Sequence, residues 1–323
     1  MSCYHPLTGY VLGVNPETGK KILKVVGKDY DGRLSSDPSV EKIAIPCGHC
    51  IGCRLKYSRV WADRCLAEAS YYKDNVFLTL TYDNDHLPSP NRLEDGSLSP
   101  MNPLVKRDLQ LFIKRLRKKL SDQKIRYFAC GEYGGTTGRP HYHIILFNCR
   151  LDDVELLVKN EREFRYYTSK TISDCWSYGF HIITKVNWST CAYVARYVVK
   201  KQTGSGAAIY DKYNIPSEFT LMSRKPGIGR QYFEDHAMDI YYDGSFLSTE
   251  EGAHRIYPNK YYDNLFDLEY PDANAVLSEE KKEFVEINNK LRSNLTSMSY
   301  VDMLKSSETN KIAQTKILTR KEV

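Results

Sequence analysis

The chain has 323 residues, of which 41% are hydrophobic and 27% charged, and its formal net charge is +6. This composition is ordinary for a globular protein and excludes a membrane-spanning or secreted one, because no apolar run can cross a bilayer and the start resembles no signal peptide. We therefore expect a cytoplasmic protein. Its positive charge and 25 tyrosines permit a nucleic-acid partner, although tyrosine also fills half-buried strand positions.

Residues 1–53 are predicted to be rich in loops, and they end in the cysteine cluster CGHCIGC. The spacing C-x2-C-x2-C suits a tetrahedral ion, which needs a fourth ligand. The candidate ligands are Cys3, Cys47, Cys50 and Cys53. His5 and His49 are possible substitutes for Cys3. We predict a structural zinc site, with an iron–sulfur cluster as the rival, because disulfides are rare in large intracellular proteins.

The other elements follow from the spacing of apolar residues. In chain order they are a helix over 54–73, a strand over 75–82, a helix over 104–120, strands over 124–133 and 141–147, a short helix over 173–179, a strand over 180–186 and a helix over 189–201. From the first strand onward this is the βαββαβ order of a ferredoxin-like unit plus one more helix. It predicts an α+β fold with an antiparallel sheet.

The chain is expected to divide into three parts. Residues 1–73 give an N-terminal zinc-binding segment and helix, and 74–201 give the core. Residues 202–323 give a mixed C-terminal extension, which opens on the Gly-rich link QTGSGA and includes the charged helical run SEEKKEFVEINNKLRSN.

Two histidines begin the strand HYHIILF. Alternate side chains of a strand share a face, so His141 and His143 point to one side and Tyr142 to the other. Two imidazoles on one surface are a pair of nitrogen ligands for a divalent cation. Glu132 lies near the end of the preceding strand, and the predicted hairpin can bring its carboxylate across as a third ligand. The alternatives are two unrelated strand histidines and a surface carboxylate.

Two tyrosines lie one turn apart in the helix YVARYVVKK. Tyr193 and Tyr197 share a face of this helix, and Lys200 and Lys201 follow near the same side. A phenol is a poor nucleophile at neutral pH, because its ordinary pKa is about 10. Ammonium groups and a metal-bound phosphate would help it, and two phenols could attack phosphodiesters in succession. The alternative is a tyrosine pair that packs on the sheet, with the lysines in solvent.

The combination resembles the HUH endonuclease superfamily, which has a His-x-His strand, a preceding Gly-Glu and a later Tyr-x3-Tyr helix with trailing lysines. The chain is most similar to the replication initiation proteins of small single-stranded DNA phages (Microviridae), in particular the gokushovirus group. The resemblance runs from PCGHCIGCR through FLTLTYDNDHLP, GEYGGTTGRPHYHIILF and YVARYVVKK to SRKPGIG.

This resemblance implies a ferredoxin-like HUH palm in which the two histidines and Glu132 hold Mg²⁺ or Mn²⁺ against the scissile phosphate of single-stranded origin DNA. One tyrosine would attack and become linked to the 5′ phosphate. The 3′ hydroxyl left behind would prime rolling-circle synthesis by a host polymerase, with a host helicase as a further partner, in the bacterial cytoplasm. The second tyrosine would cut the regenerated origin, and the freed hydroxyl would close the circle. Lys200 or Lys201 would contact phosphate or assist proton movement.

Basic residues outside the core are candidates for further DNA contacts. In the loop SRKPGIGR, Arg224, Lys225 and Arg230 supply charge, and Gly227 and Gly229 would let backbone amides approach DNA. The basic face of the helix KRDLQLFIKRLRKK is either another phosphate contact or a solvated outer surface.

The same fold also permits a protein that binds single-stranded nucleic acid without cutting it. Its sheet would resemble that of an RRM, with Tyr127 and Tyr142 stacking on bases. A metal-dependent hydrolase that uses water is a third possibility, and it needs no tyrosine pair. Formation of a covalent protein–DNA adduct separates the nuclease from both.

Overall fold

The computed structural model describes residues 3–16, 21–26, 39–135, 137–159, 165–200, 204–250, 252–295 and 297–319. The chain forms two compact units, one made of residues 1–56 and 277–323 and the other of residues 57–276. These limits differ from the predicted ones, for reasons that the packing of the larger unit makes clear.

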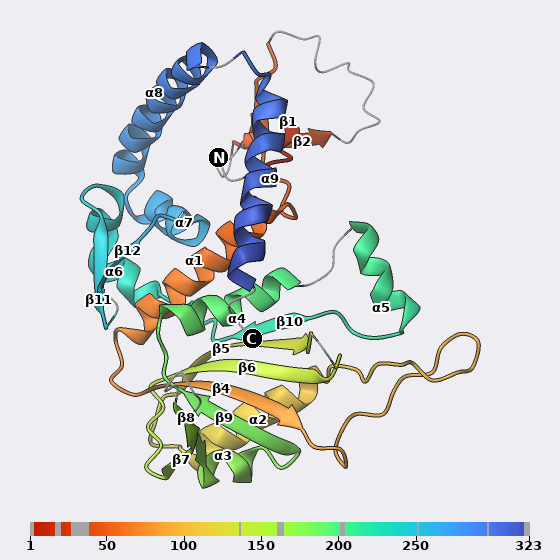
Figure 1. The fold of residues 1–323 in the computed structure, drawn as a ribbon. Coiled ribbons are helices and arrows are strands. Elements are labelled where there is room, and N and C mark those ends of the chain that lie inside the picture. Colours follow the sequence, from red (N-terminus) through yellow and green to blue (C-terminus); the bar gives the residue numbers. More distant parts are fainter. Residues whose placement is uncertain are drawn as a thin grey trace. The chain divides into compact units, whose positions relative to one another are not determined.

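The larger unit is built on a seven-stranded sheet in the order β10-β5-β6-β4-β9-β8-β7, in which all neighbouring strands are antiparallel (Figure 1). The strands are β4 (Asn75–Tyr82), β5 (Arg126–Tyr133), β6 (Pro140–Phe147), β7 (Val154–Lys159), β8 (Arg165–Ser169), β9 (Gly179–Thr184) and β10 (Phe219–Met222). All four predicted core strands are present, as β4, β5, β6 and β9. The prediction of an α+β fold with an antiparallel sheet is confirmed.

Helices α2 (Lys106–Lys119) and α3 (Lys170–Cys175) cover one face of this sheet (Figure 1). The buried stripe of α2 meets alternate residues of β4 and β6, as its helical spacing predicts. Tyr142 of β6 is fully buried in this layer, and its hydroxyl lies 2.8 Å from that of Tyr82. The expectation that Tyr142 stacks on bases is therefore wrong. Tyr127 is half-buried, with the Arg117 guanidinium 5.3 Å from its ring centre.

Helices α1 (Ile51–Ala69) and α4 (Trp188–Lys200) lie on the opposite face. Trp61 of α1 stacks on Phe128 of β5, with ring centres 4.8 Å apart, and Ala62 and Cys65 are buried beside it. The part of α1 from Tyr57 onward therefore belongs with the sheet. β10 extends the same sheet, so the larger unit also continues well past the predicted boundary at residue 201.

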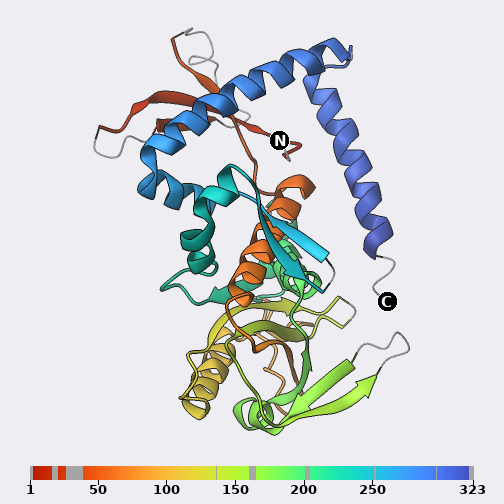
Figure 2. The same ribbon diagram turned by 90° about the vertical axis from the view of Figure 1, so that its left-hand side faces the viewer.

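The remaining elements of the larger unit are short. They are a 3₁₀ turn over Gly204–Ala207, α5 (Ala208–Lys212), α6 (Arg230–Tyr241), β11 (Ser245–Thr249), β12 (Gly252–Ile256) and α7 (Lys260–Glu269). β11 and β12 form a separate hairpin. Figure 2 shows β7 and β8, in light green, extending from the rest of the sheet as a second hairpin.

The smaller unit contains a three-stranded antiparallel sheet in the order β2-β1-β3. Its strands are β1 (Leu7–Val14), β2 (Lys21–Val26) and β3 (Lys42–Ile45), where the sequence predicted mainly loops. Most of α8 (Pro271–Leu295) and all of α9 (Tyr300–Thr319) also belong to it. α8 contains the predicted charged helix.

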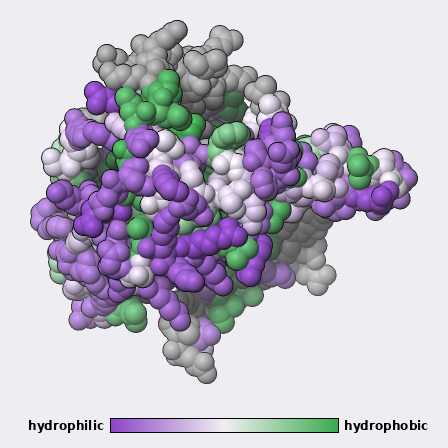
Figure 3. All heavy atoms as spheres, turned by 90° about the horizontal axis from the view of Figure 1, so that it is seen from below, coloured by the Kyte–Doolittle hydropathy of each residue, from purple (hydrophilic) through white to green (hydrophobic). Residues whose placement is uncertain are grey.

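The surface seen in Figure 3 is mainly hydrophilic, with hydrophobic side chains gathered in a few patches. No helix in the described ranges is long and apolar enough to cross a membrane.

Candidate active site

Strands β5 and β6 bring Glu132 and the two histidines to one face of the sheet. Glu132 is the register partner of His141, as the predicted hairpin requires. Its Oε1 lies 3.0 Å from Nε2 of His143, and these two side chains are only 3% and 4% exposed. On the other side of the ring, Oγ1 of Thr79 lies 3.1 Å from Nδ1. Contacts at both ring nitrogens fix the orientation of His143.

Thr79 was not identified from the sequence. The alternation of FLTLTY shows that Thr79 and Thr81 share a face of β4, but the pairing of β4 with β6 was needed to place them beside the histidines.

The ring of His141 lies over the backbone of Gly134. A Cβ at Gly134 would stand 2.8 Å from Nε2 of His141, closer than side chains approach. Among the described residues, four cysteines form the only group of three or more His, Cys, Asp or Glu side chains whose ligand atoms all lie within 4.8 Å of one another. The His141, His143 and Glu132 ligand atoms are therefore less tightly grouped here, and rotation of the half-buried His141 side chain is required to close the set.

Helix α4 places Tyr193 against the same histidine. The ring centres of Tyr193 and His143 are 5.2 Å apart, with an interplanar angle of 85°. Phe77 contacts both rings, at 6.1 Å from each. The phenol-bearing helix and the Glu132–His143 pair thus meet on one face of the sheet. The side chains of Tyr197 and Lys200, and the whole of Lys201, lie outside the described part of the chain.

The loop between β10 and α6 holds the predicted DNA contacts. Arg224 and Lys225 are exposed. Arg230 is half-buried, and its guanidinium lies 2.6 Å from a carboxylate oxygen of Glu234 and 2.5 Å from one of Glu269. The hydrogen bonds to Glu234 and Glu269 raise the pKa of Arg230 despite opposing burial. Because two carboxylates already compensate its charge, Arg224 and Lys225 are the stronger candidates for contact with phosphate.

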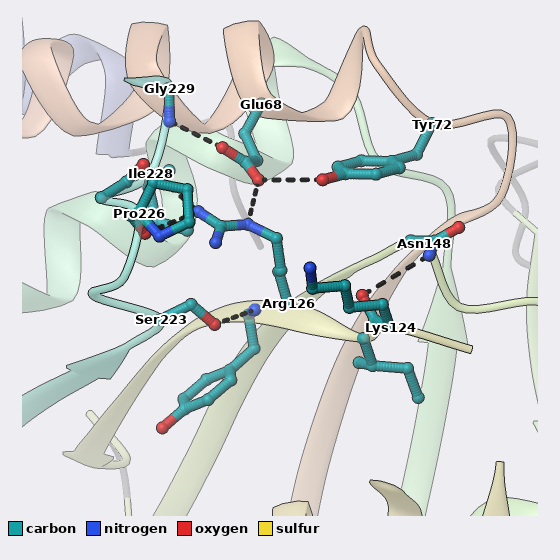
Figure 4. Close-up of polar contacts among 12 residues, drawn as sticks. Glu68, Tyr72, Lys124, Arg126, Asn148, Ser223, Pro226, Ile228 and Gly229 are labelled. Carbon is teal, nitrogen blue, oxygen red and sulfur yellow. Dashed lines mark hydrogen bonds and ion pairs between the residues drawn. The ribbon is translucent and has the colours of Figure 1, made fainter. Parts of the chain in front are cut away.

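Buried polar contacts fix this loop to α1 and β5 (Figure 4). Arg126 forms an ion pair with Glu68 and donates to the carbonyl oxygens of Pro226 and Gly227, at 3.0 and 3.2 Å. The other carboxylate oxygen of Glu68 accepts a hydrogen bond of 2.7 Å from the amide of Gly229. The expectation that this amide approaches DNA is therefore wrong.

Packing explains both glycines instead. A Cβ at Gly227 would lie 2.5 Å from the hydroxyl oxygen of Tyr261, so no larger residue fits. Gly229 has a φ of +73°, which L side chains rarely adopt, and a Cβ there would lie 2.7 Å from the hydroxyl oxygen of Tyr262.

Replacing Arg126 with methionine should destabilise the larger unit by about 3–5 kcal/mol, because it leaves the Glu68 carboxylate buried without its cation. Urea denaturation at neutral pH measures this loss. The matched control is Lys119→Met, which breaks the exposed ion pair with Asp174 and should change stability little. Equal effects of the two replacements would show that Glu68 does not depend on Arg126.

The four predicted cysteine ligands converge within the smaller unit. The sulfur atoms of Cys3, Cys47, Cys50 and Cys53 all lie within 4.8 Å of one another. Backbone amides point at them, since the amide of Tyr4 donates to Sγ of Cys50 at 3.3 Å and that of Cys47 to Sγ of Cys3 at 3.2 Å. This cluster can bind a metal ion such as zinc. His5, a suggested substitute, instead contacts Glu308 at 2.6 Å.

The thiols of this cluster differ in acidity. Burial raises the pKa of Cys50, but hydrogen bonds from the amides of Cys53 and Tyr4 outweigh it and lower the pKa to about 6. Burial and the neighbouring thiols raise the pKa of Cys53 to about 12. One thiolate is therefore present at neutral pH, and a bound cation is what would allow the other thiols to ionise beside it.

Comparison with known proteins places the chain in a class. The family model for the replication-associated protein ORF2 matches residues 75–202. The replication-associated protein ORF2 of Spiroplasma virus 4 is 35% identical over 268 residues, which cover 81% of this chain and 80% of the relative. The replication-associated protein VP4 of Bdellovibrio phage phiMH2K is 34% identical over 236 residues, covering 71% and 69%. That of Chlamydia phage 1, ORF4, is 33% identical over 165 residues, covering 49% and 38%.

These relatives define a class of phage replication-associated proteins. The chain belongs to the Microviridae family of these proteins, which confirms the resemblance found in its motifs. The matched range contains Glu132, both histidines and both tyrosines of α4. No solved structure matches the chain.

Proposed function

We propose that this protein initiates rolling-circle replication by cutting and rejoining single-stranded origin DNA through a phosphotyrosine intermediate. The observation that carries the proposal is the contact of Tyr193 with His143, whose ring in turn contacts Glu132. A tyrosine beside a histidine–carboxylate pair is suited to attack a phosphate held there. The replication-associated names of its relatives support a role in initiation.

The strand order supports a ferredoxin-like HUH palm. In chain order, the second strand of the core lies beside the third, the third beside the first and the first beside the fourth, which gives β5-β6-β4-β9. β4 and β5 run in the same direction with β6 between them, as a βαββαβ unit with crossing helices on one face requires.

The chemistry of the donors fits a divalent ion. Two imidazole nitrogens and a carboxylate oxygen suit Mn²⁺, and Mg²⁺ would rely more on Glu132 and on phosphate oxygens. An ion bound by His141, His143 and Glu132 would neutralise charge on the scissile phosphate. For Nε2 of His143 to be a ligand, the proton must sit on Nδ1, from which the Thr79 oxygen can accept.

The proposed reaction balances without a further reactant. The phenol oxygen of one tyrosine attacks phosphorus, the bond to the 3′ oxygen breaks, and the phenol proton ends on the freed 3′ hydroxyl. Lys200 or Lys201 is suited to assist that proton movement or to contact phosphate. The second tyrosine cuts the regenerated origin in the same way. The freed 3′ hydroxyl then attacks the first phosphotyrosine, which closes the circle and restores the phenol.

In this role the protein acts in the cytoplasm of the bacterial host, with single-stranded origin DNA as substrate. A host polymerase extends the 3′ hydroxyl, and a host helicase separates the strands. Arg224 and Lys225 are suited to hold DNA outside the cutting site.

The deciding experiment uses single-stranded oligonucleotides that tile the genome encoding this chain, incubated with the full-length protein and Mn²⁺. A 3′-labelled oligonucleotide containing the origin should yield labelled protein that survives denaturation, and the same oligonucleotide labelled at its 5′ end should release a shortened strand ending in a 3′ hydroxyl. Cutting without an adduct would indicate a hydrolase that uses water. Binding without cutting would indicate a non-catalytic single-strand binder.

Replacing Gly134 with alanine should slow adduct formation by roughly 10- to 100-fold, because the new methyl group displaces the His141 ring. The initial rate of adduct formation measures this loss. Gly135→Ala is the matched control, since a Cβ at Gly135 meets nothing within 4 Å. If both variants keep the native rate, the position of His141 does not limit the reaction.

A further inference from the structure

Two rows of side chains cross the sheet on the face that carries the histidines. Each row joins register partners on four neighbouring strands, β9, β4, β6 and β5. The first row is Phe180, Thr81, His141 and Glu132, and the second is Ile182, Thr79, His143 and Cys130. The proposed catalytic residues thus stand at one end of each row and apolar residues of β9 at the other.

The β9 end of these rows is open to solvent. Phe180 is 68% exposed and Ile182 is 38% exposed, whereas His143 and Glu132 are buried. Adjacent strands are about 4.8 Å apart, so Phe180 stands roughly 10 Å from His141 along the row. Neither row contains an exposed carboxylate, since its single acidic residue, Glu132, is 3% exposed. A polyanion could cross this surface without meeting negative charge from the rows.

We infer that Phe180 stacks on a base of the single-stranded DNA that enters the catalytic site across β9. The inference rests on the proposed function and adds a positioning residue to it. An exposed aromatic ring in line with the metal ligands is placed to hold the nucleotide next to the scissile phosphate. Stacking on a phenyl ring is tolerant of base identity, so Phe180 would fix the path of the strand while other contacts select the sequence.

The test compares two fluorescein-labelled 20-nucleotide strands of equal charge, oligo(dT) and a fully abasic strand, by fluorescence anisotropy without added divalent ions. Phe180→Ala should weaken binding of oligo(dT) by about tenfold and leave the abasic strand unaffected. Phe180→Trp should retain native affinity for oligo(dT). The matched control is Phe246→Ala, which removes another exposed phenylalanine (58%), on β11, and should bind both strands like the native protein.

Native oligo(dT) affinity in Phe180→Ala, or an equal loss on both strands, would overturn the inference. So would a change from dimer to monomer in sedimentation with unchanged DNA affinity, because Phe180 would then cover a second copy of the chain. The outcomes also separate this inference from the proposed function. Adducts with no base-dependent effect of Phe180 would leave only the nuclease standing. A base-dependent effect without adducts would leave only the stacking site.

Discussion

Replacing Tyr193 and Tyr197 together with phenylalanine is expected to lower adduct formation by at least about a thousandfold, because no phenol of α4 then remains to attack phosphorus. Each single replacement should leave part of the adduct, since the other tyrosine lies only one turn away. We expect the larger loss from Tyr193→Phe, because this ring contacts His143. Phenylalanine keeps the ring in the contact with His143 and Phe77, so the double variant tests the hydroxyl groups and not the packing.

The rate is measured in single-turnover reactions with the 3′-labelled origin strand and Mn²⁺. Tyr242→Phe, which changes a half-exposed tyrosine at the end of α6, should cut at the native rate. Oligonucleotide binding by the double variant should stay close to native, which separates lost chemistry from lost binding. An adduct formed by the double variant would place the nucleophile on another residue.

The sequence could predict the part of this site that depends on local geometry. Strand periodicity put His141 and His143 on one face, and a short turn between β5 and β6 allowed only an adjacent hairpin, which brought Glu132 to them. The predicted strand over 75–82 has the same limits in the structure. The coarse fold followed from the order of such elements.

Contacts between distant segments were beyond the same reasoning. Phe219 pairs with Gly131 across 88 positions of the chain, and four residues of β10 carry too short a pattern to reveal that pairing. β2 is exposed at five of its six positions, so it shows no alternation of buried and exposed residues. Period two puts Phe180 and Ile182 on one face, but only the pairing of β9 with β4 shows that it is the face of the histidines.

Removing the metal from the cysteine cluster is expected to unfold the smaller unit's three-stranded sheet. Tyr10 is the only large side chain fully buried within β1, β2 and β3, so these strands contain little hydrophobic core of their own. The other buried side chains near them belong to the cysteine cluster itself. Structural zinc sites contribute about 10–16 kcal/mol in small domains, more than such a core can supply. Cys47→Ala should therefore lose the zinc and the hydrogen-exchange protection of residues 7–14 and 42–45.

Metal analysis of the purified protein should find about one zinc per chain and no visible absorption, and a chelator should reproduce the effect of Cys47→Ala. Cys149→Ala is the matched control, because it removes a buried thiol from the core of the larger unit and should retain zinc. Acidification should also release the ion, since the thiolates, Cys50 with its pKa of about 6 included, must take up protons. Iron with sulfide would identify a cluster instead, and a Cys47→Ala variant that keeps its zinc and its protected strands would place the stabilising contacts of this unit elsewhere.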